Sequence, residues 1–232
     1  MEAEPLVLLP GLLCDQLLFA PQLPALASLR QVLIPDLTQD DSIEGMARRV
    51  LDTAPDRFAL AGLSMGGYVA LEIMRLAPGR VSRLALLDTR ARSDTPEETA
   101  RRQGLLELSA KGEFRGVTPR LLPLLIHPDR LADDALTGVV MAMAEAVGRE
   151  GFFRQQQALI AREDRRDLLG TIAVPTLVLC GREDALTPLA MHLELAAAIR
   201  EATLVVIPNC GHLAPLERPQ PVTRQLLGWL EG

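Results

Sequence analysis

The sequence predicts an α/β fold in which a mostly parallel sheet of about six strands is flanked by helices. Short apolar runs alternate along the chain with longer amphipathic runs, and this order places helices on the faces of a parallel sheet. Most of the short runs are continuously apolar, as expected of strands that are covered on both faces. The chain has 232 residues, of which 48% are hydrophobic and 23% are charged, so it is long enough to bury a sizeable core.

Six short apolar runs are the predicted strands, and five longer runs are the predicted helices. The strands are residues 6–9, 31–35, 58–61, 84–87, 176–180 and 203–207, and the helices are residues 20–29, 43–53, 65–77, 188–200 and 220–230. In the second helix, Ser42 is a suitable N-cap residue. Ile43, Met46, Ala47 and Val50 follow it at helical spacing, which gives this helix one apolar face.

Between the fourth and fifth predicted strands, over residues 90–169, the strand signal disappears. Helical pieces broken by glycine and proline replace it, so we interpret this segment as a helical cap inserted into a core formed by residues 1–89 and 170–232. Two runs in the insertion, L-L-P-L-L-I and V-V-M-A-M-A, are unusually apolar. Either they line a substrate pocket or they only pack the insertion onto the core. The predicted pocket residues are Leu13, Leu125 and Met141.

Composition and charge argue against several classes of partner. The net charge is −6 and the basic residues are scattered, so we expect no binding to nucleic acid. The N-terminal residues are acidic and no apolar run approaches the roughly 18 residues of a membrane span, which favours a cytoplasmic protein without a membrane span. Cys14, Cys180 and Cys210 are widely spaced without a C-x-x-C pair, so reduced thiols are expected rather than disulfides or a zinc site. The sequence leaves the oligomeric state open.

Ser64 lies in the stretch F-A-L-A-G-L-S-M-G-G, between a predicted strand and a predicted helix. A sharp strand-to-helix turn forces a serine into a strained backbone conformation, and small neighbours such as Gly62 and Gly66 relieve the crowding. The helix N-terminus would then face any anion that forms at the serine. We therefore predict that Ser64 is a nucleophile; the alternative is an ordinary serine in a glycine-rich loop.

A serine hydroxyl needs a base, and the chain has three histidines. His212 follows the last predicted strand, which places it at the same edge of the sheet as Ser64, so it is the predicted base. His192 lies within a predicted helix and is interpreted as a partly exposed helical residue. His127 precedes Pro128 inside the cap, where a structural role is favoured although its side chain could reach the pocket.

The base in turn needs a carboxylate that fixes its tautomer and stabilises its positive charge. Asp184 is the first choice, because it follows the fifth predicted strand and stands 28 residues before His212. Asp88 closes the fourth strand and is a credible substitute. Glu183 is adjacent to Asp184 but is expected to point elsewhere on the turn.

An oxyanion hole needs backbone N–H groups that point at the charge forming on the substrate carbonyl oxygen. One predicted donor is the N–H of Met65, the residue after the nucleophile. The second is the N–H of Leu12, in the loop where Gly11 is expected to turn the chain, and Leu13 is the nearby alternative. An ordinary strand-to-helix turn would also account for this loop.

The motifs L-P-G-L-L-C-D, G-L-S-M-G-G, G-R-E-D-A-L-T-P and C-G-H-L-A-P-L-E-R-P occur in this order along the chain. With them the sequence resembles the α/β-hydrolase superfamily over essentially its whole length. It looks most similar to small carboxylesterases such as the pimeloyl carrier-protein methyl ester esterases and the 3-oxoadipate enol-lactonases. The resemblance implies a cap after the sixth strand of the full family fold.

The sequence departs from the family pattern in two places. Many relatives have His-Gly at the oxyanion loop, whereas this chain has Pro10 before Gly11, which leaves the backbone donor and alters the rim. The first predicted strand corresponds to the family's third, so we expect a smaller sheet that lacks the customary first two strands.

The predicted function is hydrolysis of a small-molecule carboxylic ester through an acyl-enzyme, with Ser64, His212 and Asp184 as the triad. This chemistry requires no metal or organic cofactor. The apolar cap suggests an uncharged acyl group of short to medium length. A lactonase or an acyltransferase with the same triad is the alternative enzyme, and a non-catalytic hydrolase homologue that binds a ligand is the alternative outside enzymes.

Overall fold

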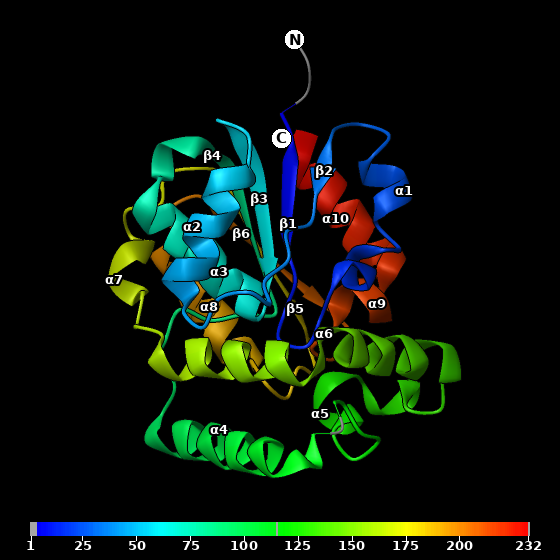
Figure 1. Cartoon of the computed structure of the whole chain (residues 1–232). Coiled ribbons are helices and arrows are strands. Elements are labelled where there is room, and N and C mark those ends of the chain that lie inside the picture. The colour runs from blue at the N-terminus through cyan, green and yellow to red at the C-terminus, as the bar shows by residue number, and fades with distance from the viewer. Residues whose placement is uncertain (1–3, 115, 232) are drawn as a thin grey trace.

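The computed structural model describes residues 4–114 and 116–231 and is built around a six-stranded parallel sheet (Figure 1). The strand order is β2-β1-β3-β4-β5-β6, and every neighbouring pair is parallel. The strands are β1 (Leu6–Leu9), β2 (Val32–Leu33), β3 (Phe58–Leu63), β4 (Val81–Leu87), β5 (Thr176–Gly181) and β6 (Ala202–Ile207). The predicted α/β fold, with about six strands and helices on both faces, is therefore confirmed.

The strands in the middle of the sheet are the most deeply buried. Every residue of β1, β3 and β5 is buried, which explains why these strands read as continuously apolar runs. The edge strand β2 has only two residues in place of the five predicted, and it pairs with β1 alone. Pro35 cannot donate a backbone hydrogen bond, so the pairing cannot continue through it.

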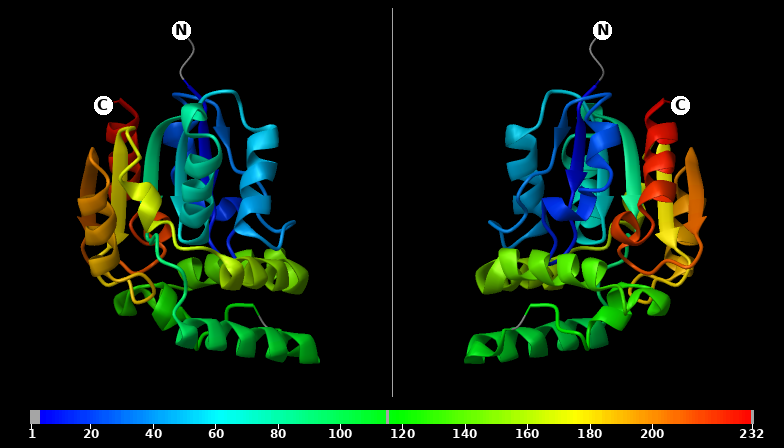
Figure 2. Two further views of the ribbon diagram at one scale, coloured as in Figure 1. Left: turned by 90° about the vertical axis from the view of Figure 1, so that its left-hand side faces the viewer. Right: turned by 90° about the vertical axis from the view of Figure 1, so that its right-hand side faces the viewer.

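Helices cover both faces of the sheet (Figures 1 and 2). On one face lie α2 (Ile43–Thr53), α3 (Met65–Leu76) and α8 (Leu189–Ala198); on the other lie α1 (Leu23–Leu26), α9 (Ala214–Glu217) and α10 (Pro219–Glu231). Helix α2 begins as predicted, because the Ser42 side chain accepts a hydrogen bond from the N–H of Gly45. The predicted helix 20–29 is reduced to the single turn α1. None of the described helices combines the length and the apolar character needed to cross a bilayer.

The chain between β4 and β5 is helical and lies beyond the carboxyl ends of the strands (Figures 1 and 2). Helix α6 crosses this edge of the sheet, and α4 lies farther out. Helix α6 is broken at Gly148, where φ is 68°. The segment contains α4 (Pro96–Leu108), a π-helical turn (Ser109–Glu113), α5 (Leu122–Leu125), α6 (Asp134–Ala161) and α7 (Arg166–Leu169). Short 3₁₀ turns occupy Gln16–Phe19, Pro78–Arg80 and Pro128–Arg130.

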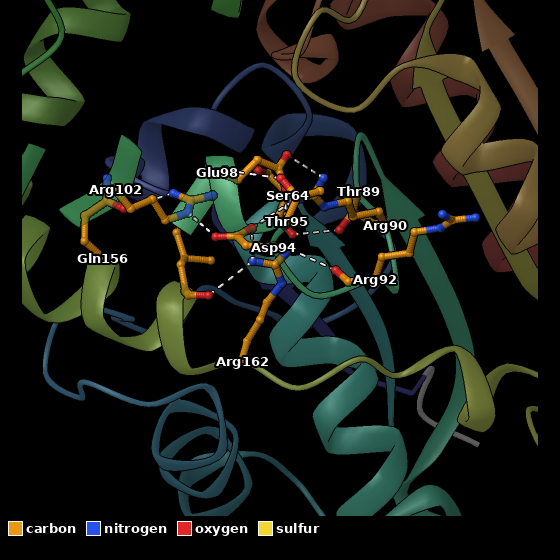
Figure 3. Close-up of polar contacts among 11 residues, drawn as sticks. Ser64, Thr89, Arg90, Arg92, Asp94, Thr95, Glu98, Arg102, Gln156 and Arg162 are labelled. Atoms are coloured by element: carbon orange, nitrogen blue, oxygen red, sulfur yellow. Dashed lines mark hydrogen bonds and ion pairs between the residues drawn. The ribbon is translucent and has the colours of Figure 1, made fainter. Parts of the chain in front are cut away.

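A buried ion cluster ties the outgoing and returning ends of this segment together (Figure 3). The Asp94 carboxylate lies 2.6 Å from the guanidinium of Arg162 and 2.6 Å from that of Arg102. The Arg90 guanidinium lies 2.8 Å from the same carboxylate. Burial by itself would raise the pKa of Asp94, but the charges of Arg162 and Arg102 outweigh it and lower that pKa. Asp94 is therefore an ionised anchor at the neck of the segment.

Candidate active site

Ser64 occupies a sharp turn between β3 and α3. Its φ is 53° and its ψ is −114°, a left-handed conformation that is uncommon for any residue except glycine. The chain packs so closely here that a Cβ atom on Gly62 would lie 2.2 Å from the Gly66 carbonyl oxygen, and one on Gly66 would lie 2.1 Å from the Leu9 carbonyl oxygen. Only glycine fits at these two positions, and the half-buried Ser64 side chain is held at the top of the turn.

Backbone contacts fix Ser64 from both sides. Its N–H donates to the Leu87 carbonyl over 3.0 Å, and its own carbonyl accepts a hydrogen bond from the Thr89 hydroxyl over 2.8 Å (Figure 3). Helix α3 begins at the next residue, so its N-terminus points toward the serine. The Ser64 hydroxyl makes no hydrogen bond to any of the described residues, His212 included.

His212 and Asp184 form a buried hydrogen-bonded pair. His212 Nδ1 lies 2.8 Å from Asp184 Oδ2, and both side chains are almost fully enclosed. The backbone N–H of His212 donates to the Leu125 carbonyl over 3.0 Å, so α5 helps to hold this loop. An ionised carboxylate only accepts, so Nδ1 carries a hydrogen, and in the neutral form of the ring Nε2 keeps its lone pair. Nε2 has no partner among residues 4–114 and 116–231, which leaves it available as a base.

Asp184 is held as a carboxylate by several donors besides His212. Its Oδ1 accepts from the N–H groups of Leu186 and Thr187, at 2.8 and 3.0 Å, and its Oδ2 accepts from the Thr187 hydroxyl at 2.6 Å. Burial favours a higher pKa for Asp184, but the charge of His212 and these hydrogen bonds outweigh it and lower the pKa. Thr187 was not among the predicted residues. The spacing of an aspartate and a threonine three residues later nevertheless indicates a turn in which the aspartate side chain accepts hydrogen bonds from the residues that follow it.

Asp88 and Glu183, the other carboxylates considered, contact backbone rather than His212. Asp88 is fully buried, and its Oδ1 accepts from the N–H of Gly181 over 2.8 Å. Burial, reinforced by the negative charge of Asp184, raises the pKa of Asp88 well above its usual range. Glu183 accepts from the N–H of Cys210 over 3.0 Å, so it braces the loop that carries His212.

The other two histidines are engaged elsewhere. The interpretation of His192 as partly exposed is wrong: it is fully buried, and its Nε2 accepts from the N–H of Thr89 over 3.0 Å. Burial lowers the pKa of His192 to about 4, so this residue is neutral. His127 Nδ1 accepts from the N–H of Asp129 over 3.2 Å, and its backbone N–H donates to the Glu217 carboxylate over 2.6 Å.

The loop after β1 forms a turn beside Ser64. The turn is closed by a hydrogen bond of 3.1 Å from the N–H of Cys14 to the Gly11 carbonyl, and its left-handed residue is Leu13, with φ of 57°. A Cβ atom on Gly11 would lie 3.4 Å from the Ser64 Cβ atom, so the two turns are in contact. Within the described part of the chain, the N–H groups of Leu12 and Met65 have no hydrogen-bond partner.

The alternative donor in this loop, the N–H of Leu13, is already engaged. It donates to Gln155 Oε1 over 3.1 Å. Gln155 comes from α6, 142 residues away in the sequence, and nothing in the pattern of that helix singled it out.

Apolar side chains from the β4–β5 segment pack into one cluster with those of the sheet face that α1, α9 and α10 cover. Leu13 is buried in this cluster, and the partly buried Leu12 and Leu125 pack against it. Met141 is half-buried and lies outside the cluster, whereas Met143 is fully buried inside it. The structure thus brings together two of the three predicted pocket residues.

The three cysteines are buried and unpaired. Burial raises the pKa of Cys14 and of Cys180 to about 12, and it raises that of Cys210 as well. All three are therefore protonated thiols at neutral pH, with little nucleophilic character.

Known proteins share this architecture. The chain matches the alpha/beta hydrolase family over residues 6–225. It is similar to a thermophilic esterase from Thermogutta terrifontis, with a TM-score of 0.89 and 30% identity over 98% of this chain and 89% of the esterase. It is also similar to the enol-lactonase from Burkholderia xenovorans LB400, with a TM-score of 0.88 and 26% identity over 100% of this chain and 93% of the lactonase.

In sequence, the chain is 30% identical over 225 residues to the dihydrolipoyllysine-residue acetyltransferase component of the acetoin cleaving system from Pseudomonas putida. The match covers 89% of this chain but only 58% of that longer relative. The resemblance to pimeloyl carrier-protein methyl ester esterases and enol-lactonases that the motifs indicated is confirmed. The fold, the order of the motifs and these likenesses agree, and the chain belongs to the alpha/beta hydrolase family.

Proposed function

We propose that this protein is a serine hydrolase that cleaves carboxylic esters through an acyl-enzyme. The observation that carries the proposal is the buried Asp184–His212 pair, 2.8 Å between Oδ2 and Nδ1, at the sheet edge where Ser64 sits in a left-handed turn. The acid orients the histidine, the histidine activates the serine, and the free N–H groups of Leu12 and Met65 supply the oxyanion hole.

The reaction has two balanced steps. His212 Nε2 takes the Ser64 proton while Ser64 Oγ attacks the ester carbonyl carbon, and the carbonyl oxygen takes up negative charge beside Leu12 and Met65. The intermediate collapses, His212 gives the proton to the departing alcohol, and an acyl group remains on Ser64. Water then attacks this acyl group while His212 takes one of its protons. The bond between the acyl carbon and Ser64 Oγ breaks, His212 returns the proton to Ser64 Oγ, and the carboxylic acid leaves. None of these steps uses a metal ion or an organic cofactor.

Residues 90–169 act in this proposal as the cap that selects the acyl group. An apolar cluster that contains Leu13 and Met143, with Leu125 packed against it, joins the segment to the oxyanion loop. We infer that a substrate bound between this segment and Ser64 has an uncharged acyl chain of short to medium length, because a buried charge without a partner is costly.

A second activity on the same triad is acyl transfer or lactone opening. The similarity of this chain to an enol-lactonase and to an acetyltransferase component supports this second candidate activity. In acyl transfer an alcohol or amine replaces water in the second step, so product analysis with competing nucleophiles separates transfer from hydrolysis. A lactone differs only in that the leaving alcohol stays attached to the acyl group.

The direct test is turnover of p-nitrophenyl esters graded by acyl length. Ser64→Ala should reduce kcat by at least about 10⁴-fold, because the nucleophile is one member of a cooperative set. Circular dichroism of the variant should match the parent, since only one half-buried hydroxyl is removed. Turnover of Ser64→Ala close to that of the parent would contradict the proposal, and the chain length with the highest kcat/KM measures the pocket.

A further inference from the structure

Gln155 connects helix α6 to two loops at the carboxyl edge of the sheet. Its side chain is fully buried. Its Oε1 accepts from the N–H of Leu13, at 3.1 Å, in the loop after β1, and its Nε2 donates to the carbonyl of Leu37, at 3.3 Å, in the loop after β2. Helix α6 crosses this edge (Figure 1), so one amide group connects both loops to the segment that lies beyond the sheet edge.

The loop after β1 needs such support because of its backbone conformation. Leu13 has φ of 57°, which is uncommon for a residue with a side chain and persists only where the surroundings hold it. The bond from Cys14 to Gly11 closes the turn from inside. The bond from Leu13 to Gln155 fixes the outer face of the turn and takes up an N–H that would otherwise be buried without an acceptor.

Building on the proposed function, we propose that Gln155 is a positioning residue for the oxyanion hole. The peptide plane that carries the Leu13 N–H also carries the Leu12 carbonyl, so a hydrogen bond to it restricts the rotation of Leu12 and thereby the direction of the Leu12 N–H. Oxyanion stabilisation depends on donors that already point at the forming charge. Gln155 therefore links the position of α6 to the direction of the Leu12 N–H in the oxyanion hole, without touching the substrate.

The neighbouring glutamine is a matched control. Gln156 is equally buried on the same helix, but its Oε1 accepts from the Arg102 guanidinium at 2.9 Å within the β4–β5 segment (Figure 3). Gln155→Met and Gln156→Met each remove a buried amide from α6 while nearly conserving its volume. Only the first removes the acceptor from the oxyanion loop.

The experiment compares both variants with the parent in three measurements: kcat and KM for an activated ester, thermal midpoint, and affinity for a trifluoromethyl ketone, which forms a tetrahedral adduct on serine. For Gln155→Met we expect kcat and the affinity for the ketone to fall together by at least about tenfold, with KM changed less than about threefold. For Gln156→Met we expect kcat and ketone affinity within about twofold of the parent. Gln155→Ala serves the same test if the methionine variant does not fold.

Two results would overturn the inference. Kinetics and ketone affinity of Gln155→Met close to those of the parent would show that the hole does not depend on this amide. Equal losses in both variants, together with lowered thermal midpoints, would assign Gln155 a merely structural role in α6. A parent protein that hydrolyses no ester and is not labelled at Ser64 would instead overturn the proposed function itself.

Discussion

Asp184 accepts a hydrogen bond of 2.8 Å from His212 Nδ1, across two loops that lie 28 residues apart in the sequence. The same carboxylate accepts from the hydroxyl and the N–H of Thr187, so its position does not depend on the histidine alone. A carboxylate fixed in this way holds one tautomer of the imidazole and favours its protonated form during catalysis. The pairing therefore separates the role of Asp184 from that of the neighbouring Asp88.

Asp184→Asn should lower kcat by about 10³ to 10⁴-fold, because an amide cannot both orient and stabilise the imidazolium. Asp88→Asn is the matched control: its remaining carbonyl oxygen can still accept from the N–H of Gly181, and the raised pKa of Asp88 indicates that the neutral side chain suits this site. Activity within about threefold of the parent is expected for it. A larger loss of kcat in Asp88→Asn than in Asp184→Asn, measured with the same ester, would assign to Asp88 the role of orienting His212.

Gly66, two residues after Ser64, should be intolerant of any side chain. A Cβ atom on Gly66 would lie 2.1 Å from the backbone oxygen of Leu9, which cannot move without the strand, so Gly66→Ala should lower the free energy of unfolding by about 3 kcal/mol or more. Gly104→Ala, in helix α4 with open space around it, should raise that free energy by about 0.5 to 1 kcal/mol. Urea unfolding measures both, and equal stability of the two variants would argue against a tightly packed turn.

Asp94 should make stability depend on pH in the acid range. The pKa of Asp94 is lower in the folded protein than in the unfolded chain. The stability that Asp94 contributes is therefore complete above the pKa of the unfolded chain, near 3.9, and is lost as the pH falls through the pKa of the folded protein. Asp94→Asn leaves the buried Arg162 short of a counter-ion and should cost about 3 kcal/mol at pH 7. Urea unfolding at pH 7 and at pH 3 should show the gap between parent and variant narrowing in acid. A gap that stays constant would mean that Asp94 does not anchor the neck as a carboxylate.

Glu217 should stabilise the contact between the histidine loop and the β4–β5 segment. Its buried carboxylate accepts from the N–H groups of His127 and Leu213, at 2.6 and 3.2 Å, and Glu217→Ala leaves both without an acceptor. The free energy of unfolding should fall by about 2 kcal/mol or more, and kcat should fall as well, because Leu213 adjoins His212. The exposed Glu107→Ala provides the control in the same unfolding experiment. Equal stability of the two alanine variants would exclude this role.

The sequence was sufficient for features that depend on neighbours along the chain. The buried strands read as apolar runs because both of their faces are covered. The turn at Ser64 is predicted from the glycines on either side of it, and Gly62 is required there by contacts with Gly66 and Gly67, which lie within a few residues of it. The histidine and the aspartate followed from their places after strands, since parallel strands deliver their carboxyl ends to one edge.

Features that depend on distant partners could not be predicted. Gln155 meets Leu13 across 142 residues, and Glu217 meets His127 across 90. A polar residue in a helix usually faces solvent, so its sequence pattern does not reveal burial against a loop from another part of the chain. His192 was misjudged for the same reason: its partner, the N–H of Thr89, comes from the loop after β4.

The most direct test of the central claim is labelling with a fluorophosphonate, followed by mass spectrometry of the tryptic peptide 58–75, which contains Ser64. We expect one equivalent of adduct on Ser64, none on the Ser64→Ala variant, and labelling slowed by at least about 10²-fold in His212→Ala, because the base activates the serine. A folded protein that takes up no label at Ser64, or takes it up equally well without His212, would contradict the assignment of Ser64 as an activated nucleophile.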